Sequence, residues 1–587
     1  MKIVKLGLIS LTFFILIVTN FGSVSPAREK LSAIANSSSF LSDPFLQLPT
    51  KNTVNVVWFT EFPGDSHLVN YGSDLNQTAI ATTTKLTRVR EDQESDINQP
   101  PPKSRRDVWR HEAIITNLAP DQRLPYRVVS QEGEKVYSSD AFSLSSAPAK
   151  DSPLKILLTS DHQLMPMTAA NLEQVVATVG RVDGVFLPGD LVNIPDRASE
   201  WFDDQQGGAF FPCLQGKANY QLEQNGIITT YHGGEIIQHA PLFTAIGNHE
   251  VMGRVLPNAT LKQEFGQPHP REVAAAKYQS VMSEVNSTAA EKAAWIKDNS
   301  FNTDTYEEIF TLPQSDSGGK KYYATTFGDI RLISLYVTNI WRSPSLERNT
   351  RGRYKESEAN LDRPEEWGYG QHIFEAIAKG SPQYQWLAQE LESEAFQQAK
   401  YKIVMFHHPP HTLGGNIVPP YTNPLPKTAY SPEGQLVARY YDYPIAEDYI
   451  IRDVIPLLES AQVQLVYYGH SHLWNRFQSS SGMHFLESSN VGNSYGAHLG
   501  ENKREIPAYS PENYTAVGDP NGLQAIVPNI APLMDENGQP LPYIASNEIT
   551  AFSIFDTATG TVSSYRYDTR QPDSPAVEFD RFELHPD

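Results

Sequence analysis

Five short polar clusters in the sequence carry residue types that bind metal ions and move protons. Each follows an apolar stretch, and in chain order they are Ser160–Gln163, Gly189–Asn193, Gly247–Glu250, His407–His411 and Gly469–His472. Together they offer imidazole, carboxylate and amide groups, while the single cysteine, Cys213, lies outside all of them. Nitrogen and oxygen donors without sulfur suit iron, manganese or zinc, whereas calcium and magnesium favour more carboxylates. The clusters therefore predict a transition-metal site.

The spacing inside two clusters indicates a pair of metal ions. His470 and His472 are two residues apart, so in an extended segment their side chains share one face and can each bind a different ion. Asp190 ends an apolar stretch, and one carboxylate can bridge two ions about 3.5 to 4 Å apart. Gly189 lets the backbone turn just before it. We therefore expect Asp190 to lie between two ions.

The first cluster offers two partners for Asp161 at one metal ion. Imidazole is the better ligand, which favours His162. Successive side chains leaving a strand alternate between faces, so Gln163 shares the direction of Asp161 while His162 is turned away. We predict that Gln163 completes the site through its amide oxygen, with His162 as the alternative.

A sheet whose strands end at one edge must position these clusters. After residue 153 apolar strands alternate with helical periods. The strand candidates are 154–159, 185–187, 322–327, 330–336, 403–406 and 463–468, and the helix candidates are 169–179, 384–396 and 448–458. In α/β sheets, loops at the carboxyl ends of the strands meet around a ligand. We predict an α/β domain over residues 152–587, interrupted by long irregular stretches at 254–312, 411–446 and 499–543.

The preceding region, residues 43–147, has the short strands and turns of a β-sandwich. Its strand candidates are 54–59, 113–115, 126–129 and 141–144. The charged segment from Glu91 to Arg106 contains three consecutive prolines. We interpret it as an inserted, solvated loop rather than a binding patch.

The first 27 residues have the order of a secretory signal. Lys2 and Lys5 precede an apolar run from Leu6 to Val18, and small residues follow, which is the pattern of a cleaved export segment. The run is shorter than the roughly 20 residues that span a bilayer. We predict a secreted, periplasmic or extracellular protein without a stable membrane anchor.

Length and charge narrow the choice of partners. The chain has 587 residues, of which 40% are hydrophobic, so more than one domain is expected. Acidic residues outnumber lysine and arginine by 68 to 47, giving a net charge of −21. This balance argues against nucleic acid as a partner, because phosphate backbones bind basic surfaces.

The ordered clusters resemble the motifs of the metallophosphoesterase, or calcineurin-like, superfamily, which run D-x-H, G-D, G-N-H-E/D, H and G-H-x-H. Further stretches, such as Val54–Trp58 and Tyr322–Asp329, are similar to its purple acid phosphatase branch, which carries a fibronectin type III-like domain at the amino terminus. The resemblance implies an N-terminal all-β sandwich followed by a four-layer α/β/β/α metallophosphoesterase domain.

Carried over position by position, the resemblance implies roles for individual residues. Asp161 and His472 would bind the first metal ion, Asp190 would bridge, and Asn248, His407 and His470 would bind the second. His249 would be the acid beside the site. Independently of the resemblance, the candidates for substrate contacts are Asn248, His408 and His411, and the alternative for the two histidines is a position behind the ligands or at the surface. Two positions depart from the family pattern: Asn193 replaces the tyrosine whose phenolate colours the purple enzymes, and Gln163 replaces a histidine.

The resulting hypothesis is a secreted hydrolase of small phosphate esters that uses two ions of iron, manganese or zinc. A metal-bound hydroxide would attack phosphorus, and His249 would protonate the leaving group. The favoured activity is that of a phosphomonoesterase resembling acid phosphatases. The alternatives are a phosphodiesterase or nucleotidase, and a non-catalytic surface-binding protein.

Overall fold

The computed structural model describes residues 40–281, 288–341, 353–364, 367–368, 370–417 and 419–585. The predicted signal peptide at residues 1–27 lies outside these residues. The described residues belong to one compact unit, Ser39–Asp587. Among them, no helix combines the length and apolarity needed to cross a bilayer.

The N-terminal region is an antiparallel β-sandwich. One sheet has the order β1 (Phe45–Gln47), β2 (Val54–Thr60), β8 (Trp109–Ile115), β5 (Thr82–Lys85). The other has the order β10 (Lys135–Ser138), β9 (Leu124–Glu132), β3 (Ser66–Tyr71), β4 (Gln77–Ile80), with β11 (Phe142–Leu144) also paired to β9. Strand β2 is buried on both faces, because Val56 and Trp58 enter the sandwich core while Val57 and Phe59 pack with the following domain.

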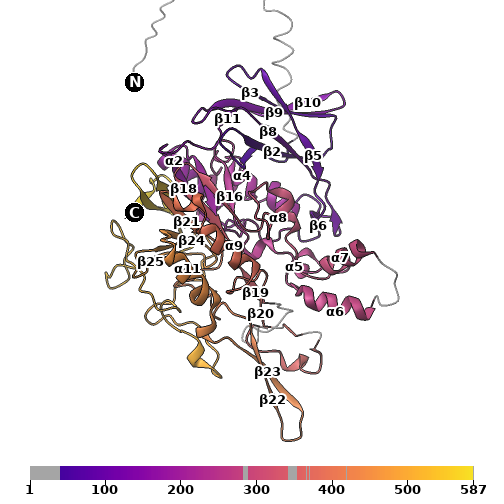
Figure 1. The fold of residues 1–587 in the computed structure, drawn as a ribbon, viewed down its shortest axis with the longest axis vertical. Coiled ribbons are helices and arrows are strands. Elements are labelled where there is room, and N and C mark those ends of the chain that lie inside the picture. The colour runs from indigo at the N-terminus through magenta and orange to yellow at the C-terminus, as the bar shows by residue number, and fades with distance from the viewer. Residues whose placement is uncertain are drawn as a thin grey trace, which may run out of the picture. The chain divides into compact units, whose positions relative to one another are not determined.

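Two further sheets form the centre of the second domain (Figure 1). The first has the order β16 (Leu242–Thr244), β13 (Gly184–Leu187), β12 (Lys155–Leu158), β28 (Ile549–Asp556), β29 (Thr561–Asp568), β30 (Val577–Glu583). The second has the order β17 (Tyr323–Phe327), β18 (Ile330–Ser334), β21 (Tyr401–Met405), β24 (Leu465–Tyr468), β26 (His484–Ser488), β25 (Trp474–Gln478), β27 (Tyr543–Ile544). In each sheet the strands nearest the predicted clusters run parallel: β12, β13 and β16 in one, and β18, β21, β24 and β26 in the other.

Successive side chains of the second sheet point to opposite faces, and each face packs against a different layer. Ile403 and Leu465 belong to the core that also contains the first sheet, whereas Val404 and Val466 pack with apolar residues of α9 (Pro382–Leu391) and α11 (Ile455–Ser460). Helix α2 (Thr168–Val179) contacts β28 of the first sheet. The predicted fold, an all-β sandwich followed by a four-layer α/β/β/α domain, is confirmed.

Two of the helix predictions are divided in the structure. The helix expected over 384–396 is α9 followed by α10 (Glu394–Gln397), because Ser393 accepts a hydrogen bond from Phe396 N and starts a new helix. The helix expected over 448–458 consists of the π-helical turn η5 (Ile450–Val454) and then α11.

The prediction that residues 254–312 are irregular is wrong. This stretch forms α5 (Leu261–Phe265), α6 (Arg271–Val281), α7 (Ala289–Asp298) and α8 (Asp304–Ile309). Side-chain caps at Thr260 and Thr288 start two of these helices.

Elsewhere, smaller elements are α3 (Ala198–Phe202), α4 (Phe210–Leu214), the hairpins β14 (Tyr220–Gln224) with β15 (Ile227–Tyr231) and β22 (Leu425–Tyr430) with β23 (Leu436–Asp442), the pair β19 (Asn339–Trp341) with β20 (Gln371–Ile373), and the 3-10 turns η1 (Asn248–Glu250), η2 (Glu358–Asn360), η4 (Ile445–Glu447) and η6 (Pro511–Asn513).

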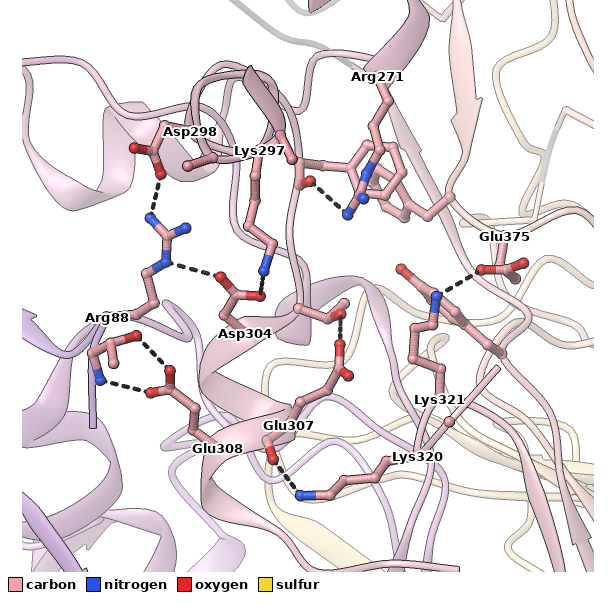
Figure 2. Close-up of a pocket in the computed structure, with 18 of the residues that line it drawn as sticks. Arg88, Arg271, Lys297, Asp298, Asp304, Glu307, Glu308, Lys320, Lys321 and Glu375 are labelled. Atoms are coloured by element: carbon pink, nitrogen blue, oxygen red, sulfur yellow. Dashed lines mark hydrogen bonds and ion pairs between the residues drawn. The ribbon is translucent and has the colours of Figure 1, made fainter. Parts of the chain in front are cut away.

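The charged segment of the sandwich is not a solvated loop, which corrects that prediction. We call residues 88–106 the β6–β7 arm, after its strands β6 (Arg90–Glu91) and β7 (Ser104–Arg105). Arg88 pairs with Asp298 at 2.7 Å and with Asp304 at 2.9 Å in the second domain (Figure 2). Arg90 pairs with Asp196 at 2.6 Å. The arm is charged because it docks through ion pairs.

Candidate metal centre

The strand ends bring the predicted metal ligands together in two groups. Ligand atoms of Asp190, His407 and His470 all lie within 4.8 Å of one another, and so do those of Asp161, Asp190 and His472. His407 Nε2 is 3.1 Å from Asp190 Oδ2, from Asn248 Oδ1 and from His470 Nδ1. Asp190 belongs to both groups, as a bridging carboxylate would.

Glycines leave room for two of these carboxylates. A Cβ on Gly247 would lie 2.2 Å from Asp190 Oδ1, and a Cβ on Gly469 would lie 2.1 Å from Asp161 Oδ2. The glycines of the G-N-H-E and G-H-x-H clusters are therefore required by the carboxylates packed against them.

Several ligand residues also adopt left-handed backbone conformations. Their φ angles are +58° at Asp161, +56° at Asp190, +84° at His470 and +54° at His472. Such conformations cost free energy in residues other than glycine and concentrate at functional sites. The turns that follow the strands are thus held in place by their surroundings.

Hydrogen bonds orient two of the three predicted histidine ligands. His407 Nδ1 donates to Pro188 O at 2.9 Å, and His472 Nδ1 donates to Asn493 O at 3.1 Å. In both rings Nε2 is left for a metal ion, which is the usual arrangement of a histidine ligand.

Two buried glutamates hold the ligand loops without belonging to either ligand group. Glu250 accepts hydrogen bonds from the backbone N–H of Gly247, Asp190 and Leu191 at 2.7 to 2.9 Å. Glu487, at the end of β26, accepts from Ser471 N at 2.7 Å. Glu250 stands in a recognisable cluster, whereas no motif in the sequence marks Glu487.

Asp190 and His407 shift each other's pKa values. Burial alone would raise the pKa of Asp190, but the nearby His407 outweighs it and the pKa lies below its usual range. Burial opposes the charged form of His407 as well, yet Asp190 raises its pKa to about 9. A metal ion would bind His407 only in its deprotonated form.

The donor set fits a pair of transition-metal ions. It combines imidazole nitrogens with carboxylate and amide oxygens, which suits iron, manganese or zinc. In addition, the buried Gln163 Oε1 has no hydrogen-bond partner among the described residues. A buried polar oxygen without a partner is costly unless a ligand completes it.

His162 and Gln163, the two candidates of the first cluster, are both buried, and each has a polar atom without a hydrogen-bond partner among the described residues. The buried His162 ring lies near Phe210, and its Nε2 hydrogen-bonds with Thr159 Oγ1 at 3.0 Å. Burial lowers the pKa of His162 to about 3. Thr159 thus engages one nitrogen of the His162 ring, and Gln163 as the ligand stays a prediction.

We expect Gln163→Ala to lower the affinity for one of the two metal ions, since it removes a neutral oxygen donor. His162→Ala should keep both ions, although it leaves a cavity in the core and lowers the melting temperature. Gln163→His should tighten the weakened site, because imidazole is the better donor. Metal titration of the three variants checks this, and loss of an ion in His162→Ala alone would reverse the assignment.

The other predicted residues take different positions. His249 and Asn248 line a cavity of about 1030 Å³ over the ligands. His249 Nδ1 hydrogen-bonds with Asn193 O at 2.7 Å, which leaves Nε2 as the nitrogen able to donate a proton. The backbone carbonyl of Asn193 thus orients the proposed acid, whichever side chain stands at this position.

His408 and His411 do not line this cavity. His408 is buried, with its ring centroid 4.7 Å from that of His470. His411 pairs with Asp519 at 2.7 Å and packs against Phe485. The prediction that these two histidines contact substrate gains no support from their positions.

The cavity wall contains residues that the sequence did not single out. Tyr495 stacks on His472 with the ring centroids 4.9 Å apart, and Phe265 stacks on His249 at 5.0 Å. The buried Arg504 donates to Gly414 O at 2.9 Å and to Gly518 O at 2.6 Å, so it joins two loops of the wall. Phe265 and Arg504 lie in the long stretches 254–312 and 499–543, and Tyr495 lies just before the second of these. No periodicity or motif marks any of the three.

Comparison with known proteins agrees with the geometry of the site. A family model described as calcineurin-like phosphoesterase matches residues 154–473, and one described as purple acid phosphatase, N-terminal domain, matches residues 42–145. The chain therefore belongs to the calcineurin-like phosphoesterase family, with the N-terminal domain of purple acid phosphatases. It is a phosphoric ester hydrolase of a family that uses a dimetal centre.

Comparison with curated proteins gives no match. Among solved structures, one titled "Crystal structure of Br derivative BhCBM56" is similar over 19% of this chain and 95% of its own, at 14% identity and a TM-score of 0.12.

Proposed function

We propose that this hydrolase is an exported phosphomonoesterase that binds two ions of iron, manganese or zinc. The observation that carries the proposal is the shared position of Asp190 in two ligand groups, each within 4.8 Å. Export is supported by the order of charged, apolar and small residues in positions 2–27, which is typical of a secretory signal.

Activation of water and neutralisation of the phosphoryl charge are the chemistry that two bound cations supply in such a site. Asp161, Gln163 and His472 would hold one cation, Asn248, His407 and His470 the other, and Asp190 both. His249 acts on the leaving group rather than on the attacking water. Its Nε2 gives a proton to the oxygen of the departing alcohol, while Asn193 O keeps Nδ1 protonated and the ring aimed at the cavity.

The cavity supports a small phosphate ester as the substrate. Its volume of about 1030 Å³ is at the upper end of the range of ordinary ligand pockets. It therefore has space for an organic leaving group beside the phosphoryl group. The same space would admit a diester, which is the alternative activity.

Metal analysis combined with two parallel assays tests the proposal. We expect close to two transition-metal ions per chain after purification in metal-replete buffer, and faster turnover of a generic phosphomonoester than of a generic phosphodiester. A metal content near zero, or a requirement for magnesium alone, would contradict the metal assignment. Faster turnover of the diester would replace the proposed activity by the alternative.

A further inference from the structure

Helix α5 supplies the second contact that orients His249. The Phe265 ring at the end of α5 stacks on the His249 ring, with centroids 5.0 Å apart and planes inclined by 30°. The hydrogen bond from Nδ1 to Asn193 O fixes one edge of the imidazole, and the aromatic face limits rotation of the ring about that bond. The orientation of His249 therefore depends on where α5 lies.

Helix α5 is too short to hold that position by itself. It contains five residues, Leu261–Phe265, and isolated helices shorter than about 12 residues are marginal in water. Leu261 packs with Ile194 and Met252 in a small apolar cluster, which offers limited burial. Further contacts must fix the helix.

Those contacts come from the β6–β7 arm of the N-terminal sandwich. The Glu264 carboxylate on α5 is fully buried and pairs with Arg90 and Lys103 of the arm, each at 2.7 Å. Asp92 of the arm is also buried and accepts a hydrogen bond from Leu261 N at 2.6 Å. Because a buried charge without its partner is strongly disfavoured, α5 can keep its place only while the arm stays docked.

We propose that the β6–β7 arm is a positioning element for the catalytic acid: through Glu264 and helix α5 it keeps Phe265 against His249. This inference rests on the role of His249 in the proposed function. The N-terminal sandwich contributes no predicted metal ligand. Through Arg90, Asp92 and Lys103 it nevertheless affects how His249 transfers its proton.

The test compares two substitutions in the same arm. Lys103→Met removes one of the two cations paired with Glu264, whereas Arg88→Met removes ion pairs between the arm and Asp298 and Asp304 (Figure 2) without a contact to α5. Arg88→Met leaves Arg90, Asp92 and Lys103, the residues of the arm that contact α5, unchanged, so only Lys103→Met disturbs the support of Phe265. Arg88→Met is therefore the matched control.

We expect Lys103→Met to lower kcat for alkyl phosphates about tenfold, as a misaligned acid would, and kcat for nitrophenyl phosphate less than twofold. Nitrophenolate leaves without a proton, so the ratio of the two rates reports on the acid. Arg88→Met should leave this ratio unchanged, and both variants should keep two metal ions. An equal loss for both esters in Lys103→Met, or the same ratio in both variants, would overturn the inference.

Two further variants separate the possible failures. Phe265→Leu keeps every ion pair of the arm and should reproduce the effect of Lys103→Met even if the latter folds poorly, while Phe265→Tyr should restore the rate ratio. His249→Ala is measured in parallel. If His249→Ala shows the dependence on leaving group and Phe265→Leu does not, the positioning role fails alone. If His249→Ala shows none, the acid role in the proposed function fails, and the positioning role fails with it.

Discussion

Replacing Asp190 by asparagine is expected to abolish most of the activity and to release metal. The substitution keeps the shape of the side chain and removes the negative charge that belongs to both ligand groups. Charge stabilisation by metal ions contributes several kcal/mol to such reactions, and each 1.36 kcal/mol is a factor of ten in rate. We therefore expect kcat/KM to fall by about 10³- to 10⁴-fold.

Elemental analysis by mass spectrometry should show fewer than two ions per chain in Asp190→Asn after gel filtration. Asp556→Asn is a suitable control, because this carboxylate caps Ala558 N at 2.9 Å in the turn after β28. Its metal content and activity should match those of the unaltered protein. Two tightly bound ions and nearly full activity in Asp190→Asn would exclude a bridging role.

The ligand clusters were predictable because chemistry and topology restrict them together. Asp161, Asp190 and His407 each follow a parallel strand within a few residues, at β12, β13 and β21. Side chains at the carboxyl ends of parallel strands meet at one edge, so residue type and strand position together indicated a site, while the role of each residue came from the family resemblance. Alternation of side chains also favoured Gln163 over His162, and that choice stays a prediction because both side chains are buried.

The β6–β7 arm could not be predicted, because a run of charges looks the same whether water or buried carboxylates surround it. Lys103 pairs with Glu264, which lies 161 residues further along the chain. No local pattern links two such positions. The helices of residues 254–312 were missed for a related reason: α5 and α8 are short, and tertiary contacts rather than periodicity stabilise them.

The walls of the cavity depend on tertiary packing in the same way. Tyr495 and Arg504 lie in a stretch without regular strands or helices among its described residues. Their places near His472 and Gly414 follow from how the loops fold over the strand ends. Sequence patterns therefore do not identify these residues of the cavity wall.

Replacing His249 by alanine is expected to slow the cleavage of esters whose leaving group needs a proton. General acid catalysis is typically worth about 10²- to 10⁴-fold, so alkyl phosphates should lose at least about 10² in kcat. Nitrophenyl phosphate should be far less affected. The metal centre should survive, because the bond to Asp190 Oδ1 comes from the backbone N–H of residue 249, at 2.9 Å, and alanine retains that group.

The measurement is a plot of log kcat against the pKa of the leaving alcohol for a series of monoesters. His249→Ala should steepen the slope, since without the acid the departing oxygen carries its full negative charge. His232→Ala provides the control: this exposed side chain hydrogen-bonds with Ala218 O at 2.9 Å and should leave the slope unchanged. Equal slopes in His249→Ala and the unaltered protein would mean that the leaving oxygen receives its proton from another group, and the cavity would then need a different acid.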